Sequence, residues 1–314
     1  MRKKILPLLC TFLCGSLLLP AIVWSAPRVV VSIKPIHALV AGVMQGVGEP
    51  QLLVKGGASP HGYVLRPSDA RALSRADLIV WVGPQLESFL KKPLATLGKR
   101  ARQLQLTKVL ADRLLPLRKS GSWEEHQHHE RADGDGEHGE FNPHLWLDPR
   151  LAEQIVAKTA AILGEIDPVH RPQYQQNATR LQARLAALHA RLKAKLAPVK
   201  HIPFIVFHDA YQYFEAAYGL NAIGSISIDP ERKPGARRIR QMRQKIKQLN
   251  VRCVFSEPQF EPRLLATIIE GTDAGTGVLD PLGADLPAGP ESYFQLLNAL
   301  ADNLLAGLRG PAAS

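Results

Sequence analysis

Cysteine is scarce in this 314-residue chain, and its three copies are badly placed for a disulfide. Cys10 and Cys14 lie in an apolar N-terminal run that we expect to be removed, which leaves Cys253 alone. A single cysteine cannot form a disulfide within the chain, and nothing near it has the spacing of a cysteine metal site. We therefore predict that Cys253 is a buried strand residue and not a ligand.

The motifs of several enzyme classes are also missing. The sequence has no HExxH pair or similar helical metal motif, and Gly56-Gly57 lacks the glycine spacing of a phosphate-binding loop. Asp209 and Glu257 are the only plausible general bases, and both are better interpreted as groups that hold a metal ligand in place without touching the metal. The sequence accordingly does not favour an enzyme.

Acidic residues are outnumbered by basic ones, and the resulting net charge of +11 is unevenly placed. Three positive charges, at residues 2–4, precede an apolar run over residues 5–23 and the small residues near Ser25. This order is typical of a secretory signal peptide, predicted here as residues 1–25. The alternative, an uncleaved membrane anchor, is less consistent with Pro20. We expect a protein that acts outside the cytoplasm, where nucleic acid is an implausible partner.

What the chain has in abundance is an alternation of short apolar runs with helical patterns. The runs are short, continuous and rich in β-branched residues, as parallel strands buried on both faces are. They lie at residues 28–33, 51–54, 78–82 and 103–106 in the first half, and at 203–207, 222–227, 251–255 and 276–279 in the second. The alternation predicts an α/β fold in which two lobes each contain a parallel sheet flanked by helices.

One long helix is predicted between the two halves. Its apolar stripe consists of Leu181, Leu185, Leu188, Leu192 and Leu196. Steps of three and four residues place these leucines on one helical face, and Pro172 and Pro198 bound the helix. We interpret it as a rigid strut packed along both lobes, with a coiled coil as the alternative. The predicted parts are a signal peptide at 1–25, an N-terminal lobe at 26–167, a linker helix at 168–200 and a C-terminal lobe at 201–314.

Histidine and acidic residues are concentrated between Trp123 and Asp148. Most of this stretch is too polar to build a core, so we predict a flexible loop over residues 120–141. Its histidines are predicted to bind zinc weakly, and this auxiliary set consists of His126, His128, His129 and His138. Sensing of metal, contact with a transporter, or disorder that is merely tolerated are the alternatives for this loop.

Four other residues are predicted to converge at the edges of the sheets. In open parallel sheets, ligands bind beyond the carboxyl ends of the strands. His208 and Asp280 directly follow predicted strands, His61 lies in the loop after the second strand, and His144 lies where order resumes after the acidic loop. Three imidazoles and a carboxylate suit zinc, whereas more carboxylates would favour manganese or iron. Each residue alone is also consistent with a structural role; Asp280 before Pro281, for example, could occupy a turn.

Six segments together resemble one known family. They are SPHGYVLRPSD (59–69), ADLIVWVGPQLE (76–87), NPHLWLDP (142–149), FHDAYQYF (207–214), SEPQF (256–260) and GVLDPLG (277–283). In this order they resemble the zinc-specific solute-binding proteins of ABC uptake systems, the ZnuA-like branch of the cluster A-I family. The resemblance covers essentially the whole mature chain, and the acidic, histidine-rich insertion is itself typical of that branch.

The resemblance implies two α/β lobes joined by one long backbone helix, with a metal site in the cleft between them. It assigns Zn²⁺ to His61, His144 and His208, with Asp280 or water in the fourth position. In manganese-specific relatives the third ligand is a glutamate, so His208 favours zinc. The implied function is high-affinity capture of Zn²⁺ in the periplasm, outside the inner membrane, and delivery to the membrane permease of a zinc ABC transporter. We expect a monomer and no catalysis.

Two departures from the family pattern affect this prediction. Some zinc members have an acidic residue just before the first histidine, where this chain has Pro60, which strengthens the case for Asp280 or water. Some also have a disulfide in the second lobe, for which Cys253 has no partner. The alternative functions are a manganese- or iron-binding or adhesin-like relative of the same fold, and a secreted zinc enzyme.

Overall fold

Two four-stranded parallel sheets form the framework of the computed structural model, which describes residues 25–118, 141–227, 234–259 and 263–310. The first sheet has the order β2-β1-β3-β4 and consists of β1 (Val29–Val31), β2 (Gln51–Leu52), β3 (Leu78–Trp81) and β4 (Arg102–Gln105). The second has the order β6-β5-β7-β8 and consists of β5 (Phe204–Val206), β6 (Ala222–Ser225), β7 (Cys253–Ser256) and β8 (Gly275–Val278). Two successive halves of the chain therefore repeat one topology.

Helices cover both faces of each sheet. In the N-terminal lobe they are α1 (Lys34–Met44), α2 (Pro67–Arg75), α3 (Lys91–Thr96), α4 (Leu106–Val109) and α5 (Pro149–Ile166). Alternate strand residues point to opposite faces, so Val29 and Val31 join the core under α1 and α5, while Val30 packs with Leu73 of α2 and Leu94 of α3. Burial on both faces explains the continuous apolar runs.

The C-terminal lobe is layered in the same way. Its helices are α7 (Gln212–Tyr218), α8 (Ala236–Gln248), α9 (Arg263–Ile269) and α10 (Ser292–Arg309). Ile205 and Val254 face Met242 of α8, whereas the opposite face of the sheet packs on α10. Cys253 lies buried in β7 as a free thiol, as predicted, and burial raises the pKa of that thiol to about 12.

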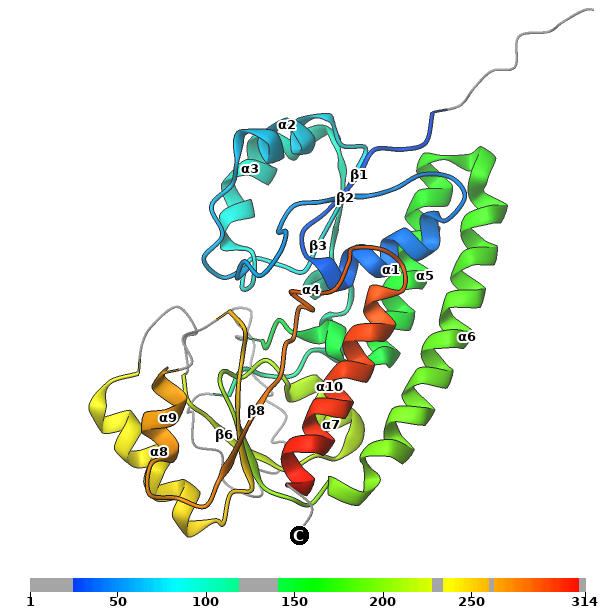
Figure 1. Cartoon of the computed structure of the whole chain (residues 1–314). Helices are drawn as coiled ribbons and strands as arrows, with labels where there is room; N and C mark the ends of the chain where they lie inside the picture. The colour runs from blue at the N-terminus through cyan, green and yellow to red at the C-terminus, as the bar shows by residue number, and fades with distance from the viewer. Residues whose placement is uncertain (1–24, 119–140, 228–233, 260–262, 311–314) are drawn as a thin grey trace, which may run out of the picture.

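The long helix between the lobes is α6 (Arg171–Leu196), 26 residues that span about 39 Å at 1.5 Å per residue. All five leucines of its stripe are buried in one hydrophobic core that includes residues of both lobes. Figure 1 shows α6 running along the side of the molecule from one lobe to the other. The prediction of two α/β lobes with a long helix between them is confirmed.

A second connection crosses between the lobes after β8. The chain leaves the C-terminal lobe, passes α1, and returns as α10 (Figure 1). The buried ammonium of Lys34, at the start of α1, donates hydrogen bonds to the carbonyls of Gly283, Ala284 and Leu286 at 2.6, 2.8 and 2.8 Å. The lobes are thus tied by this crossing segment as well as by α6.

Two helices of the N-terminal lobe begin with a proline. Arg66 is the capping residue of α2, with its N–H donating to the Asp69 carboxylate, and Pro67 occupies the first turn. Proline suits that position because its missing N–H would have no helical partner there. Asp148 caps α5, which starts at Pro149, by accepting from the Arg150 N–H.

Two predicted segments lie outside the described residues: nearly all of the signal peptide, and the histidine-rich loop from residue 119 to 140. Across the parts of the chain that the structure describes, no helix combines the length and the hydrophobicity that crossing a membrane requires.

Candidate metal centre

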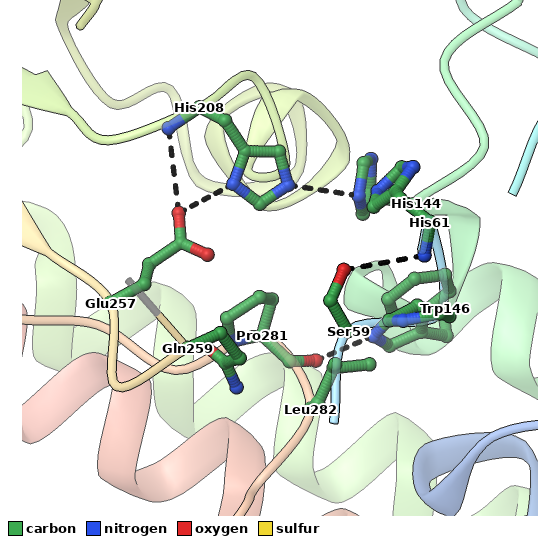
Figure 2. A pocket seen from close by; sticks show the side chains of 10 residues that line it. Ser59, His61, His144, Trp146, His208, Glu257, Gln259, Pro281 and Leu282 are labelled. Atoms are coloured by element: carbon green, nitrogen blue, oxygen red, sulfur yellow. Dashed lines mark hydrogen bonds and ion pairs between the residues drawn. The ribbon is translucent and has the colours of Figure 1, made fainter. Parts of the chain in front are cut away.

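Three histidines from distant parts of the chain meet between the lobes. His61 lies in the turn between β2 and α2, His144 directly precedes a short 3₁₀ turn (Leu145–Leu147), and His208 follows β5 by two residues. Figure 2 shows the three side chains converging on one pocket. One nitrogen from each ring lies within 4.8 Å of the others. His61 and His208 lie beyond the carboxyl ends of β2 and β5, and His144 lies after the acidic stretch, so these three side chains come together as the sequence predicted.

The spacing of two of these rings matches that of ligands on one metal ion. The Nε2 atoms of His144 and His208 are 3.2 Å apart. Two nitrogens bound tetrahedrally to zinc, each at about 2.0–2.1 Å, would lie roughly 3.3 Å apart. The centroid of the His61 ring lies 5.5 Å from that of His144 and 5.8 Å from that of His208. His61 Nε2 is buried and has no hydrogen-bond partner among the described residues.

Hydrogen bonds at the other ring nitrogens set the tautomers of two of the histidines. His208 Nδ1 lies 2.6 Å from Oε1 of Glu257, which also accepts from the His208 backbone N–H. His144 Nδ1 lies 2.9 Å from Oδ1 of Asn142. With each Nδ1 donating its proton to an oxygen, each Nε2 has a lone pair facing the pocket. Two lone pairs 3.2 Å apart repel each other unless a cation or a proton lies between them.

Burial disfavours the protonated form of two of the three imidazoles. It lowers the pKa of His61 to about 3, with the neighbouring His208 as a smaller cause. It also lowers the pKa of His144 well below the ordinary value, and here His208 and His61 both contribute. Burial raises the pKa of the Glu257 carboxyl, an effect that its contact with His208 opposes. Metal ions bind the neutral form of imidazole, so the site is poised for a cation.

The pocket is small and lined largely by apolar groups. Besides the histidines it is lined by Ser59, Pro60, Trp146, Glu257, Gln259, Pro281 and Leu282. It encloses a cavity of about 10 Å³, which is room for a single water molecule or metal ion. Trp146 closes one side, and its indole N–H donates to the Pro281 carbonyl at 2.8 Å (Figure 2). An organic substrate would not fit without opening of the lobes.

Asp280 lies close by but outside the group of three. One carboxylate oxygen accepts from the Leu282 N–H and the Gln259 amide, and the other accepts from the Ala284 N–H. The carboxylate is thus engaged with its own turn, as the structural interpretation of the Asp-Pro pair expected. Its role as a fourth ligand stays a prediction.

The two carboxylates predicted to support the ligands have different surroundings. Glu257 contacts His208 directly, as described above. Asp209 instead forms an ion pair with Arg118 at 3.0 Å, and Arg118 also contacts the buried Glu215 at 2.7 Å. Asp209 therefore lies in an ion-pair cluster beside the pocket.

Sequence reasoning missed Asn142. Its amide holds the His144 ring, although the only signal in the sequence was its place two residues before His144, where an Asn side chain can accept from the backbone. The auxiliary histidines of the loop, His126, His128, His129 and His138, lie outside the described residues. Within the described residues, the three pocket histidines form the one group of three or more side chains with metal-binding spacing.

Comparison with known proteins identifies the family. A family profile described as "Zinc-uptake complex component A periplasmic" (ZnuA) matches residues 29–307. The high-affinity zinc uptake system protein ZnuA of Brucella abortus is 47% identical over 315 residues, an alignment that covers 93% of this chain and 93% of that protein. The protein of the same name from Yersinia pestis is 36% identical, with 91% and 92% covered.

The fold agrees with this match. The crystal structure of a zinc-bound ZnuA deletion mutant has a TM-score of 0.74 and 28% sequence identity, covering 91% of this chain and 100% of that one. A family match over most of the chain, two relatives above 30% identity and a shared two-lobed fold lead to one conclusion. The chain belongs to the ZnuA family of periplasmic zinc-uptake components.

Proposed function

We propose that this protein captures Zn²⁺ in the periplasm and delivers it to the membrane permease of an ABC importer. The observation that carries the proposal is the pair of Nε2 atoms of His144 and His208, 3.2 Å apart with both Nδ1 atoms bonded to oxygens. His61 supplies a third buried nitrogen without a partner among the described residues. A cation satisfies all three nitrogens at once.

The ligand set favours zinc over manganese or iron. Imidazole suits zinc, whereas manganese prefers sites rich in carboxylate and water oxygen. We propose His61, His144 and His208 as direct ligands and Asp280, or a water, as the fourth. Asp280 would reach the ion only by releasing part of its hydrogen bonding to Leu282 and Ala284. A manganese- or iron-binding role remains the alternative within this fold.

The pocket supports binding without catalysis. A catalytic zinc keeps one position open for water and substrate, together with a general base. Here the cavity of about 10 Å³ has room for little besides the ion, and the carboxylate nearest the histidines, Glu257, is already bonded to His208. A secreted zinc hydrolase is therefore the weaker candidate.

The remaining parts of the proposal concern how the protein is deployed. We propose that residues 1–25 are removed as a signal peptide and that the mature protein acts as a monomer. The parts of that monomer are an N-terminal lobe to residue 167, a linker over 168–200 and a C-terminal lobe from 201. The apolar run and small residues near Ser25 support the cleavage.

Calorimetric titration of the metal-free protein with Zn²⁺ and with Mn²⁺ tests the main proposal. We expect one tight zinc site, at most weak manganese binding, and loss of the tight site in His61→Ala and His208→Ala. Tight manganese binding with weak zinc binding would support the alternative metal. A tight zinc site that survives His208→Ala would show that the ion binds elsewhere.

A further inference from the structure

Asn142 is a fully buried residue with every polar group engaged. Its backbone N–H donates to the Leu115 carbonyl at 3.0 Å, and its own carbonyl accepts from the Tyr213 hydroxyl at 2.9 Å. Its side chain accepts through Oδ1 from the backbone and the ring of His144, and donates through Nδ2 to the Asp209 carbonyl at 2.7 Å. Hydrogen bonds at both ends of a buried amide fix its orientation.

These partners leave no ambiguity about which end of the amide faces the histidine. A backbone N–H can only donate, so the atom facing the His144 N–H at 3.0 Å must be the oxygen. A backbone carbonyl can only accept, so the atom facing Asp209 must be the nitrogen. His144 Nδ1 therefore meets an acceptor and carries the proton, which leaves Nε2 with its lone pair toward the pocket.

Asn142 also joins the two lobes at the metal site. Asn142 belongs to the N-terminal lobe and lies two residues before His144. Its partner Asp209 belongs to the C-terminal lobe and directly follows His208. One amide thus fixes the ring of one histidine and the backbone next to another. Because His144 Nε2 and His208 Nε2 are 3.2 Å apart, a small shift of either segment would alter the distance that the ion requires.

We propose that Asn142 is a positioning residue for metal binding, which selects the Nδ1-protonated tautomer of His144 and holds that ring in register with His208. This inference rests on the proposed zinc function. Residues that hold ligands in this way typically change metal affinity by about 10–100-fold when they are replaced. A residue with only a structural role would change stability and leave the His144 tautomer as it was.

Three variants separate these roles. Asn142→Ala removes both side-chain contacts, and we expect zinc affinity to fall about 10–100-fold, with a mixture of His144 tautomers in the metal-free protein. Asn142→Asp keeps an acceptor for the ring and loses the donor to Asp209, so the tautomer should be retained and affinity partly restored. Tyr213→Phe is the matched control, because it removes the hydroxyl that holds the Asn142 backbone and leaves the amide intact.

The measurements are zinc titration and the ¹⁵N chemical shifts of the His144 imidazole. The inference is overturned if Asn142→Ala binds zinc within twofold of wild type and keeps the Nδ1–H tautomer. The inference also fails if Tyr213→Phe loses as much zinc affinity as Asn142→Ala does. It is also overturned if metal-free wild-type protein carries the proton on Nε2, a test that needs no variant to fold. Absence of tight zinc binding by wild type would instead refute the proposed function, while the tautomer measurement would still test the role of Asn142.

Discussion

The two lobes share one sheet topology, but they contribute unequally to the proposed metal centre. The N-terminal half supplies His61 and His144, whereas the C-terminal half supplies His208 alone. Their supports also differ, since the amide of Asn142 holds His144 and the buried carboxylate of Glu257 holds His208. A carboxylate makes its imidazole more basic as well as fixing its orientation, and a neutral amide does so much less.

This asymmetry indicates a division of roles between the lobes. In the proposed site, the two buried imidazoles of the N-terminal half would bind the ion incompletely on their own. The third imidazole, held by Glu257, would complete the site. Tight zinc binding would then need both the orientation that Asn142 gives His144 and the carboxylate that Glu257 places beside His208. Substitution of each residue separates the two contributions.

Removing the single ligand of the C-terminal lobe should have the largest effect. We expect His208→Ala to lower zinc affinity by more than about 100-fold, since loss of a ligand costs more than loss of a residue that holds one. Titration calorimetry of the metal-free protein measures this. His201→Ala is the control, because His201 is exposed and lies apart from the pocket. An equal loss of zinc affinity in both variants would mean that His208 is not the ligand that the C-terminal lobe contributes.

Removing the charge behind His208 should come next. We expect Glu257→Gln, which keeps the size of the side chain, to lower zinc affinity about 10–100-fold. The loss should exceed that of Asn142→Asp, because the carboxylate contributes charge as well as orientation. Competition with a zinc chelator measures both variants on one scale. If Glu257→Gln bound zinc as wild type does, the contrast between the two supports would disappear.

The sequence was sufficient for the framework because its signals are local. Continuous β-branched runs predicted the strands, and the leucine stripe predicted α6. His61 and His208 could be predicted to converge because ligands bind beyond the carboxyl ends of parallel strands, and His144 because the ordered chain resumes there. That rule predicts where on a sheet ligands lie, but it does not predict the distances of a few ångströms between the three side chains.

What the sequence could not predict depends on partners far away in the chain. Asn142 bonds to Asp209 across 67 positions, and Lys34 to Gly283 across 249. Nothing near either residue indicates such a contact. The most conspicuous histidines of the sequence, at 126–138, lie outside the described residues, whereas His144, which follows them, lines the pocket.

Loosening the tie between the lobes should have an intermediate effect. Lys34 of the N-terminal lobe holds three carbonyls of the segment that crosses from the C-terminal lobe, including Gly283. Hydrogen bonds to a charged donor contribute about 1.5–3 kcal/mol each, and about 1.4 kcal/mol corresponds to a tenfold change. We therefore expect Lys34→Met to open the lobes more readily and release zinc about tenfold faster or more, even if only one of the three bonds resists opening. Stopped-flow transfer of zinc to a chelator measures the rate, with the exposed Lys55→Met as control. An unchanged rate of zinc release would mean that α6, and not Lys34, mainly restrains the opening of the lobes.

The response to acid should be weaker than three free imidazoles would show. Protons compete with zinc only below the pKa of each histidine in the folded protein, and that pKa is about 3 for His61 and well below the usual value for His144. At pH 5.5 an imidazole with an ordinary pKa would add about a tenfold loss of affinity, and these two should add none. Titrations at pH 7.5, 6.5 and 5.5 measure the slope. A loss of about 1,000-fold at pH 5.5, relative to pH 7.5, would show that all three rings protonate.

The smallest effect should come from the most conspicuous segment. Replacing residues 124–140 with a Gly/Ser linker of equal length removes four histidines and seven carboxylates and leaves both lobes' ligands in place. Pro116 and Phe141, which flank the loop, pair across its base, and the Asn142 N–H bonds to Leu115, so its ends are held independently of its sequence. Calorimetry should show the tight zinc site unchanged within about twofold, because none of its three imidazoles is removed, while additional weak zinc binding is lost. Loss of the tight site in this variant, together with its survival in His208→Ala, would move the functional centre from the cleft between the lobes to the loop.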